Sequence, residues 1–208
     1  MESKFVISDV VKSSWQALKS QIWILVGLLI GFTIIALLIS LLTLPLVHSL
    51  LGNIVVQVFS LVISLIFSLG YTKNFFQALD GEEPQFSAYG QQAPKILTLF
   101  IANILVAVIV MIGTLLLIIP GIYLALRLQF FVAFIVEENA GILDSLKRSW
   151  EITDRQVFPL FLLFLAMFGI MIIGVILLGI GIFVATPLCY MISCYTFRKL
   201  NTPTVNNE

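Results

Sequence analysis

Long apolar runs dominate the pattern of this chain and predict helices that cross a membrane. The runs cover residues 22–44, 53–72, 96–119, 121–136 and 157–197. A helix needs about 20 apolar residues to span the hydrocarbon, and the last run is about twice that length. Gly179-Ile180-Gly181 predicts a turn in its middle and Pro120-Gly121 a tight turn between the third and fourth runs, so six spans are expected. The runs lack the alternation of apolar and polar residues that barrel strands show, which favours helices.

Two shorter segments that precede spans have an amphipathic helical pattern. In residues 142–153 the apolar side chains recur three or four positions apart, and charged side chains occupy the opposite face. Residues 7–18 show the same pattern. Such helices lie flat at the membrane interface, so we predict that they anchor the protein there. The predicted interfacial anchors are Trp15, Trp150, Lys147 and Arg148. The alternative is that the charged faces dock a soluble partner.

Six identical residue pairs relate these two segments at a constant offset of 135 positions. They are Ile7 and Ile142, Asp9 and Asp144, Lys12 and Lys147, Ser14 and Ser149, Trp15 and Trp150, and Gln21 and Gln156. A fainter copy surrounds Tyr89. We therefore predict an all-α integral membrane protein with six transmembrane helices as three parallel helical hairpins, each preceded by a short amphipathic interfacial helix. The hairpin units cover about residues 5–80, 85–138 and 140–200 of a single domain (residues 1–200), and residues 201–208 form a disordered tail.

Charge is scarce in this chain and lies on one predicted side. Hydrophobic residues make up 60 % of the sequence, charged residues make up 11 %, and the formal net charge is zero. Apart from Arg127, every Lys and Arg falls at an end of the chain or in alternate connections. The connections near residues 45–52, 118–121 and 178–181 contain no charged residue. Because cytoplasmic loops are enriched in Lys and Arg, we expect both termini on the cytoplasmic side.

Arg127 is the exception, because it lies within a predicted span. An arginine at the centre of a membrane helix costs about 2.5–3.5 kcal/mol on insertion scales, so it should face the bundle interior, a cavity or a partner. No acidic residue occurs in any predicted span. The candidate neighbours are backbone carbonyls near Pro120 or Pro187, a lipid phosphate, or the hydroxyl and amide groups of Tyr123, Gln129, Asn103, Gln57 and Tyr190. One hypothesis is an anion or lipid-headgroup site, because a guanidinium suits phosphate. The other is a structural arginine that bonds backbone carbonyls and locks the hairpin.

Motifs for catalysis and metal binding are missing from the sequence. It contains no His-Glu-x-x-His, no Gly-x-Ser-x-Gly and no Gly-rich phosphate loop, so we expect no enzyme activity. His48 is the only histidine, and we expect no metal and no cofactor. The acidic pairs Glu82-Glu83 and Glu137-Glu138 are interpreted as solvated helix caps. Ten cytoplasmic cations face eleven acids, so no basic patch for nucleic acid is predicted.

One stretch of the sequence resembles a known family. Ile118-Ile-Pro-Gly-Ile-Tyr-Leu-Ala-Leu-Arg-Leu128 is followed by Val136-Glu-Glu and by Leu143-Asp-Ser-Leu-Lys-Arg-Ser-Trp-Glu-Ile-Thr153. Together these segments resemble the membrane domain attached to some bacterial glycerophosphoryl diester phosphodiesterases, and related uncharacterised proteins that consist of that domain alone. The resemblance is strongest over residues 115–165. It implies an all-helical bacterial membrane protein; the phosphodiesterase activity of such fusions belongs to a separate soluble domain and does not carry over.

The sequence therefore predicts a non-catalytic protein of the bacterial cytoplasmic (inner) membrane that organises or binds lipid or a membrane partner. The expected partners are membrane lipids, including anionic headgroups, and a protein at the cytoplasmic face. The alternative is a small transporter or lipid-handling protein with a midplane anion or headgroup site at Arg127. An intramembrane enzyme has the least support, because we find no nucleophile–base pair.

Overall fold

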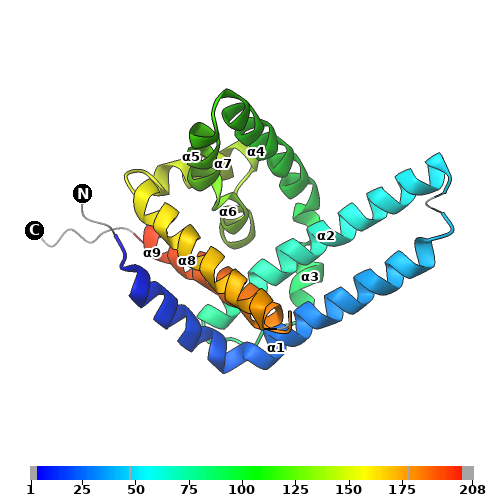
Figure 1. Ribbon diagram of the computed structural model, residues 1–208, viewed down its shortest axis with the longest axis horizontal. Helices are drawn as coiled ribbons and strands as arrows, with labels where there is room; N and C mark the ends of the chain where they lie inside the picture. The colour runs from blue at the N-terminus through cyan, green and yellow to red at the C-terminus, as the bar shows by residue number, and fades with distance from the viewer. Residues whose placement is uncertain (1–3, 47, 178, 203–208) are drawn as a thin grey trace, which may run out of the picture.

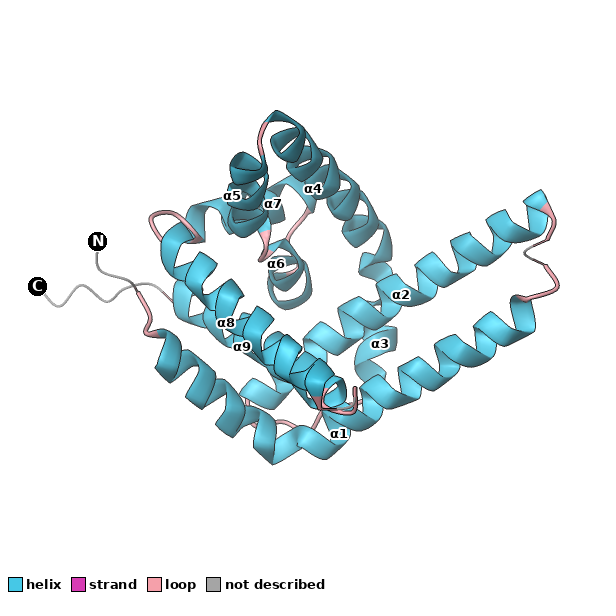
Figure 2. Ribbon diagram, viewed as in Figure 1, coloured by secondary structure: helices cyan, strands magenta, loops and turns pink. Residues whose placement is uncertain are grey.

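The protein is all-helical in the part that the computed structural model describes, which covers residues 4–46, 48–177 and 179–202. Figure 2 shows helices joined by short loops, with no strand among these residues. The helices are α1 (Ile7–Thr43), α2 (Leu50–Leu79), α3 (Ser87–Gln92), the 3-10 turn η1 (Ala93–Lys95), α4 (Ile96–Leu116), α5 (Ile118–Leu128), α6 (Phe131–Glu138), α7 (Ile142–Ile152), α8 (Val157–Ile176) and α9 (Ile182–Asn201). The all-α prediction is confirmed.

Five helical segments of the described chain are long and apolar enough to cross a membrane. They are Ile7–Thr43, Leu50–Leu79, Ser87–Leu116, Ile118–Glu138 and Val157–Ile176. In four of them few residues of the apolar stretch are buried within the protein, whereas half of that stretch is buried in Ile118–Glu138. Only lipid or another apolar partner can cover the exposed apolar side chains favourably. The chain is therefore a multi-pass membrane protein by the length and composition of its helices.

The sixth predicted span corresponds to α9, which has the length of a span but is less apolar. It packs against α1, α2 and α8, and Figure 1 shows it running behind α8. Several of its side chains, including those of Met191, Ile192 and Phe197, are fully or almost fully buried. Because neighbouring helices rather than lipid surround much of α9, its sequence tolerates hydroxyl and thiol groups that a lipid-facing helix would avoid.

The first amphipathic segment is not a separate helix, so that part of the prediction is wrong. Residues 7–18 begin α1, which continues without interruption to Thr43 and is about 55 Å long at 1.5 Å per residue. No Gly or Pro occurs in α1 before Gly27, so nothing in this stretch ends a helix. Figure 1 shows α1 bending, so that its first part lies beside α9 and its last part pairs with α2. By contrast, α7 is a separate helix, and Arg155 just beyond it has a positive φ of 56°.

The predicted turn at Pro120-Gly121 is displaced. The chain reverses at Leu117, whose φ of −164° is extended, and Pro120 lies in the first turn of α5. Proline is well accommodated there because the N–H groups of a first helical turn have no partner within the helix. A Cβ on Gly121 would lie 2.9 Å from the Cα of Thr114, so this glycine permits the close approach of α4 and α5. The turn predicted around Gly179 is confirmed, and Gly179 has a φ of 75°.

The fourth apolar run is divided into two helices. It changes direction at Gln129 and Phe130, between α5 and α6, and α6 ends at Asn139 in the left-handed conformation. Figure 1 shows that the tips of the α1–α2 and α4–α5 pairs point in different directions. The predicted tail begins inside α9, which ends at Asn201, and residues 203–208 lie outside the described residues.

The two related segments found in the sequence have closely similar surroundings. Residues 7–21 and 142–156 match in degree of burial position by position, except at Val11 and Gln21. Ser14 and Ser149 are both fully buried, whereas the exposed fractions of Trp15 and Trp150 are 40 % and 37 %. The backbone N–H of Lys4, just before the first segment, donates to Oε1 of Gln156 at the end of the second, at 3.0 Å.

Candidate functional site

Arg127 lies at the end of α5 and is almost completely buried. Its side chain is 5 % exposed, and its Nη1 donates to Oδ1 of Asp154 at 3.2 Å. The guanidinium carbon lies 4.2 Å from the ring centroid of Trp150 and 5.8 Å from that of Tyr123, and a cation in this position is attracted by the ring face. The expectation that Arg127 lacks an acidic partner is therefore wrong. Asp154 comes from the turn after α7, which places Arg127 beside that turn.

The backbone around Arg127 is bonded to α7 as well. The carbonyl oxygen of Arg127 accepts from Ser149 Oγ at 3.0 Å and from Thr153 Oγ1 at 3.2 Å. The N–H of Phe130 in turn donates to Ser149 Oγ at 3.1 Å. The two hydroxyl residues thus satisfy backbone groups freed where the chain changes direction between α5 and α6. The Nε of Arg127 is buried and has no hydrogen-bond partner among the described residues.

The structure brings together some of the predicted neighbours of Arg127 and separates others. Tyr123 joins the group, and its ring meets that of Trp150 edge-on at a centroid distance of 6.0 Å. Gln129 instead donates to the carbonyl of Leu126 at 3.1 Å. Asn103 is exposed on α4, and within the described chain no hydrogen bond links it to Arg127.

The predicted interfacial anchors fall into different environments. Lys147 is 76 % exposed and lies 3.9 Å from Glu151 one turn further along α7. Trp15 is partly exposed, whereas Trp150 covers the guanidinium of Arg127. Arg148 pairs with Glu138 and lies 4.5 Å from the ring centroid of Phe134. Of the two cations, only Lys147 is therefore freely available to the surroundings.

A network of ion pairs, which we call the ion-pair cap, joins the ends of four helices. Glu137 on α6 accepts from Lys73 on α2 at 3.4 Å and from Arg198 on α9 at 2.6 Å. Arg198 also pairs with Asp80, and its Nη2 donates to Oδ2 of that residue at 2.8 Å. The hydrogen bond to Asp80 raises the pKa of Arg198, so this side chain stays charged. The pair of Glu138 on α6 and Arg148 on α7 completes the ion-pair cap. The cap therefore consists of Lys73, Asp80, Glu137, Glu138, Arg148 and Arg198.

The interpretation of Glu137-Glu138 as solvated helix caps is wrong. The side chains of Glu137 and Glu138 are 21 % and 25 % exposed, and both are paired with cations. Oε1 of Glu138 also accepts from Nδ2 of Asn201 at 2.5 Å. Sequence reasoning missed the cap because its members lie far apart in the chain; the available signal was that charges of both signs gather at the same predicted membrane side.

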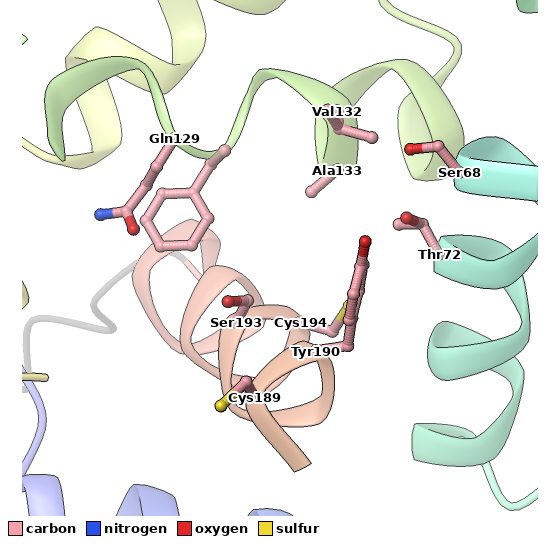
Figure 3. Close-up of a pocket in the computed structure, with 10 residues that line it drawn as sticks. Ser68, Thr72, Gln129, Val132, Ala133, Cys189, Tyr190, Ser193 and Cys194 are labelled. Atoms are coloured by element: carbon pink, nitrogen blue, oxygen red, sulfur yellow. The ribbon is translucent and has the colours of Figure 1, made fainter. Parts of the chain in front are cut away.

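A polar pocket lies between α2, the start of α6 and α9 (Figure 3). Its volume is about 280 Å³. The lining residues are Ser68, Thr72, Gln129, Phe130, Val132, Ala133, Cys189, Tyr190, Ser193 and Cys194. They include hydroxyls, an amide and thiols but no charged side chain. The two thiols belong to free cysteines. Gln129 and Tyr190 had been singled out from the sequence as candidate neighbours of Arg127, and the structure places both in the lining of this pocket.

The described residues offer no support for a metal site. No group of three His, Cys, Asp or Glu side chains there could hold a metal ion. The absence of a cofactor and of enzyme activity stays a prediction.

Comparison with known proteins identifies an uncharacterised family. A family described as a domain of unknown function, DUF7847, matches residues 45–206. Uncharacterised protein Rv2560 of Mycobacterium tuberculosis (strain ATCC 25618 / H37Rv) and uncharacterised protein Mb2590 of Mycobacterium bovis are each 32 % identical to this chain over 101 residues. That region is 49 % of this chain and 31 % of each relative, so the match covers less than a third of the relatives' length. No solved structure matches. A link to the phosphodiesterase membrane domain stays a prediction.

Proposed function

This chain belongs to the DUF7847 family, a domain of unknown function, and we propose that it is a non-catalytic bacterial inner-membrane protein that binds and organises lipid at its charged face. The observation that carries this proposal is the division of its charges into two sets. The charges of the first set are paired with each other, either in the ion-pair cap or between Arg127 and Asp154. The other set is exposed on the two related amphipathic segments, next to partly exposed tryptophans.

In each segment the exposed set combines a lysine with a partly exposed tryptophan. Lys12 and Lys147 occupy equivalent positions at the offset of 135, and both are exposed. Trp15 and Trp150 follow three positions later in each segment. Lysine next to a tryptophan at headgroup depth is the pattern of an interfacial helix, and each cation near an anionic surface contributes about 1 kcal/mol.

Reversing both lysines tests this proposal. In a Lys12→Glu/Lys147→Glu variant we expect at least about a fivefold loss of co-purified anionic lipid, because two attractive charges become repulsive. The measurement is native mass spectrometry of protein extracted from membranes that contain phosphatidylglycerol. The unfolding temperature should stay the same, since both side chains are exposed and outside the ion-pair cap.

A Lys12→Arg/Lys147→Arg variant is the matched control, because it preserves charge at both positions and should retain lipid as the wild type does. Unchanged lipid retention in the Glu variant would contradict lipid binding at this face. If the same variant instead lost one specific co-purified protein, the face would dock a protein partner.

We further propose that the chain forms six spans, with α9 as the sixth, in three hairpin units whose uncharged connections, near residues 45–52, 118–121 and 178–181 of the sequence, are external. The uncharged character of these connections supports this orientation, as does the gathering of the ion-pair cap away from them. The matched burial of residues 7–21 and 142–156 supports a duplication of the hairpin unit. A relation to the phosphodiesterase membrane domain is part of the same proposal and rests on residues 115–165.

Cysteine labelling tests the orientation. In a background without native cysteines (Cys189→Ser/Cys194→Ser), single substitutions Ser49→Cys, Leu117→Cys and Ile180→Cys should react with an impermeant maleimide in right-side-out vesicles. Lys147→Cys should react only after the vesicles are opened. Labelling of Lys147→Cys in closed vesicles, or protection of any of the other three, would contradict the arrangement.

The alternative of a transporter with an anion site at Arg127 has weaker support. Its guanidinium is enclosed by Asp154 and the rings of Trp150 and Tyr123, and little of it is exposed. We therefore propose a structural role for Arg127, which ties α5 to the turn after α7.

A further inference from the structure

The polar pocket lies directly beneath the ion-pair cap. Thr72 on its α2 wall is adjacent to Lys73, and Ala133 on α6 and Cys194 on α9 each precede a cap residue by four positions. Four residues of helix correspond to about 6 Å. The pocket is therefore within one helical turn of the charged layer, the depth at which the headgroup and glycerol regions of a lipid would lie if the cap faces the membrane surface.

Three hydroxyl groups in the pocket have no partner within the protein. Thr72 is 6 % exposed, yet in the part of the chain that the structure describes no hydrogen bond involves its Oγ1, nor Ser68 Oγ or Tyr190 Oη. Figure 3 shows these three side chains directed toward one another from α2 and α9.

Thr72 also lacks the local bond that several helical Thr residues make to a carbonyl four residues earlier, as do Thr33 at 2.8 Å, Thr114 at 2.9 Å and Thr196 at 2.7 Å. Thr72 is buried, Ser68 is half-buried and Tyr190 is 36 % exposed, so their hydroxyls can bond a molecule that occupies the pocket. Ser68, Thr72 and Tyr190 thus point to a ligand that can both donate and accept.

The pocket also restricts the charge and the size of that ligand. No charged side chain lines it, so nothing in its walls compensates an ionised group, and desolvating such a group would be costly. Its volume of about 280 Å³ is at the lower end of the range for small-molecule sites. Phe130, Val132 and Ala133 form an apolar wall opposite the hydroxyls, which suits a carbon skeleton.

We propose that this pocket binds a small neutral polyol group about the size of glycerol, held by the hydroxyls of Ser68, Thr72 and Tyr190. Such a group occurs in the headgroup of uncharged lipids such as monoacylglycerol, whose glycerol keeps a free diol, and in free polyols. The site is separate from the lysine-bearing face proposed above to bind anionic lipid, and it goes beyond that function.

The thiol of Cys189, which lines the pocket and is partly exposed, provides a local readout. In a Cys194→Ser background, alkylation of Cys189 by N-ethylmaleimide is followed in nanodiscs of phosphatidylcholine. One series contains increasing monooleoylglycerol, a second contains phosphatidic acid, which is anionic and has no polyol, and a third adds free glycerol to the buffer. Saturable protection by monooleoylglycerol and none by phosphatidic acid is expected; protection by free glycerol at similar concentrations would identify a soluble polyol as the source.

Substitutions then assign the hydroxyls. Thr72→Val and Tyr190→Phe should each weaken the protection about fivefold, which is the effect of losing one neutral hydrogen bond. Thr33→Val, at a threonine outside the pocket, is the matched control and should leave protection unchanged. Ala133→Leu, which adds volume to the pocket wall, should abolish protection while the protein remains folded.

Three results would overturn the proposal. They are no protection by either neutral probe, equal protection in the wild type and in Thr72→Val with Tyr190→Phe, and protection by phosphatidic acid as strong as that by monooleoylglycerol. None of these depends on the Lys12→Glu/Lys147→Glu experiment, because that variant changes no residue of the pocket. Failure of one proposal therefore leaves the other to be judged on its own result.

Discussion

A Glu137→Gln variant is expected to unfold several degrees below the wild-type protein. Glu137 is the shared acceptor of Lys73 and Arg198, so one substitution removes both ion pairs that join α6 to α2 and α9. Fully exposed pairs contribute about 0–1 kcal/mol each, whereas breaking a fully buried pair costs about 3–5 kcal/mol. With side chains 21–35 % exposed, these pairs lie between the two limits, and we expect a loss of about 1–3 kcal/mol in total.

The physical reason for the loss is that two cations stay behind without their acceptor. Arg198 keeps Asp80, but Lys73 has no other ion-pair partner among the described residues. The amide of glutamine accepts hydrogen bonds but carries no charge, so it only partly replaces the carboxylate. The measurement is the thermal unfolding midpoint in detergent at fixed pH.

Glu83→Gln is the matched control, because it makes the same chemical change at an exposed glutamate without an ion pair in the described chain. Its midpoint should match that of the wild type. If the two variants unfolded at the same temperature, the ion-pair cap would contribute nothing measurable. A Lys73→Met substitution in the Glu137→Gln background should recover part of the loss, since it removes the lysine left unpaired.

The features that the sequence predicted well are those that depend on local composition. Crossing a membrane requires about 20 apolar residues, so the apolar runs alone indicate which helices are long enough. The turn at Gly179 was also predictable, because few residues other than glycine adopt its φ of 75° readily. By contrast, the sequence did not predict that α1 continues from its amphipathic start into the first span. A helix that runs from an amphipathic into an apolar segment has no local signal at the junction.

The features that the sequence missed depend on contacts between distant segments. Asp154 follows Arg127 by 27 residues, and the pair forms only because the chain breaks between α5 and α6 and turns again after α7. The polar pocket was hidden for a related reason. Thr186, Cys189, Tyr190 and Ser193 recur three or four positions apart on α9, which indicates a polar stripe, but the long apolar run around them concealed it.

The pair of Arg127 and Asp154 separates the structural hypothesis from the anion-site hypothesis. Arg127→Gln is expected to lower stability by about 2–3 kcal/mol, because it removes the ion pair and the attraction of the Trp150 ring and leaves a shorter side chain in a packed position. Asp154→Asn should cost less, about 1 kcal/mol, since Asp154 is 62 % exposed and water weakens its interaction. Thermal unfolding of both single variants and the double variant measures their coupling.

Arg155→Gln is the matched control for these changes. Arg155 also lies near Asp154, at 3.7 Å, but its side chain is 83 % exposed, so its loss should have almost no effect on the unfolding midpoint. Lipid retention, measured by native mass spectrometry on the same samples, then decides between the hypotheses. The structural role requires that Arg127→Gln retain anionic lipid as the wild type does despite its lower stability. Loss of that lipid at an unchanged midpoint would reverse the assignment, because it would show that the guanidinium, whose Nε has no partner among the described residues, binds a headgroup without contributing to stability.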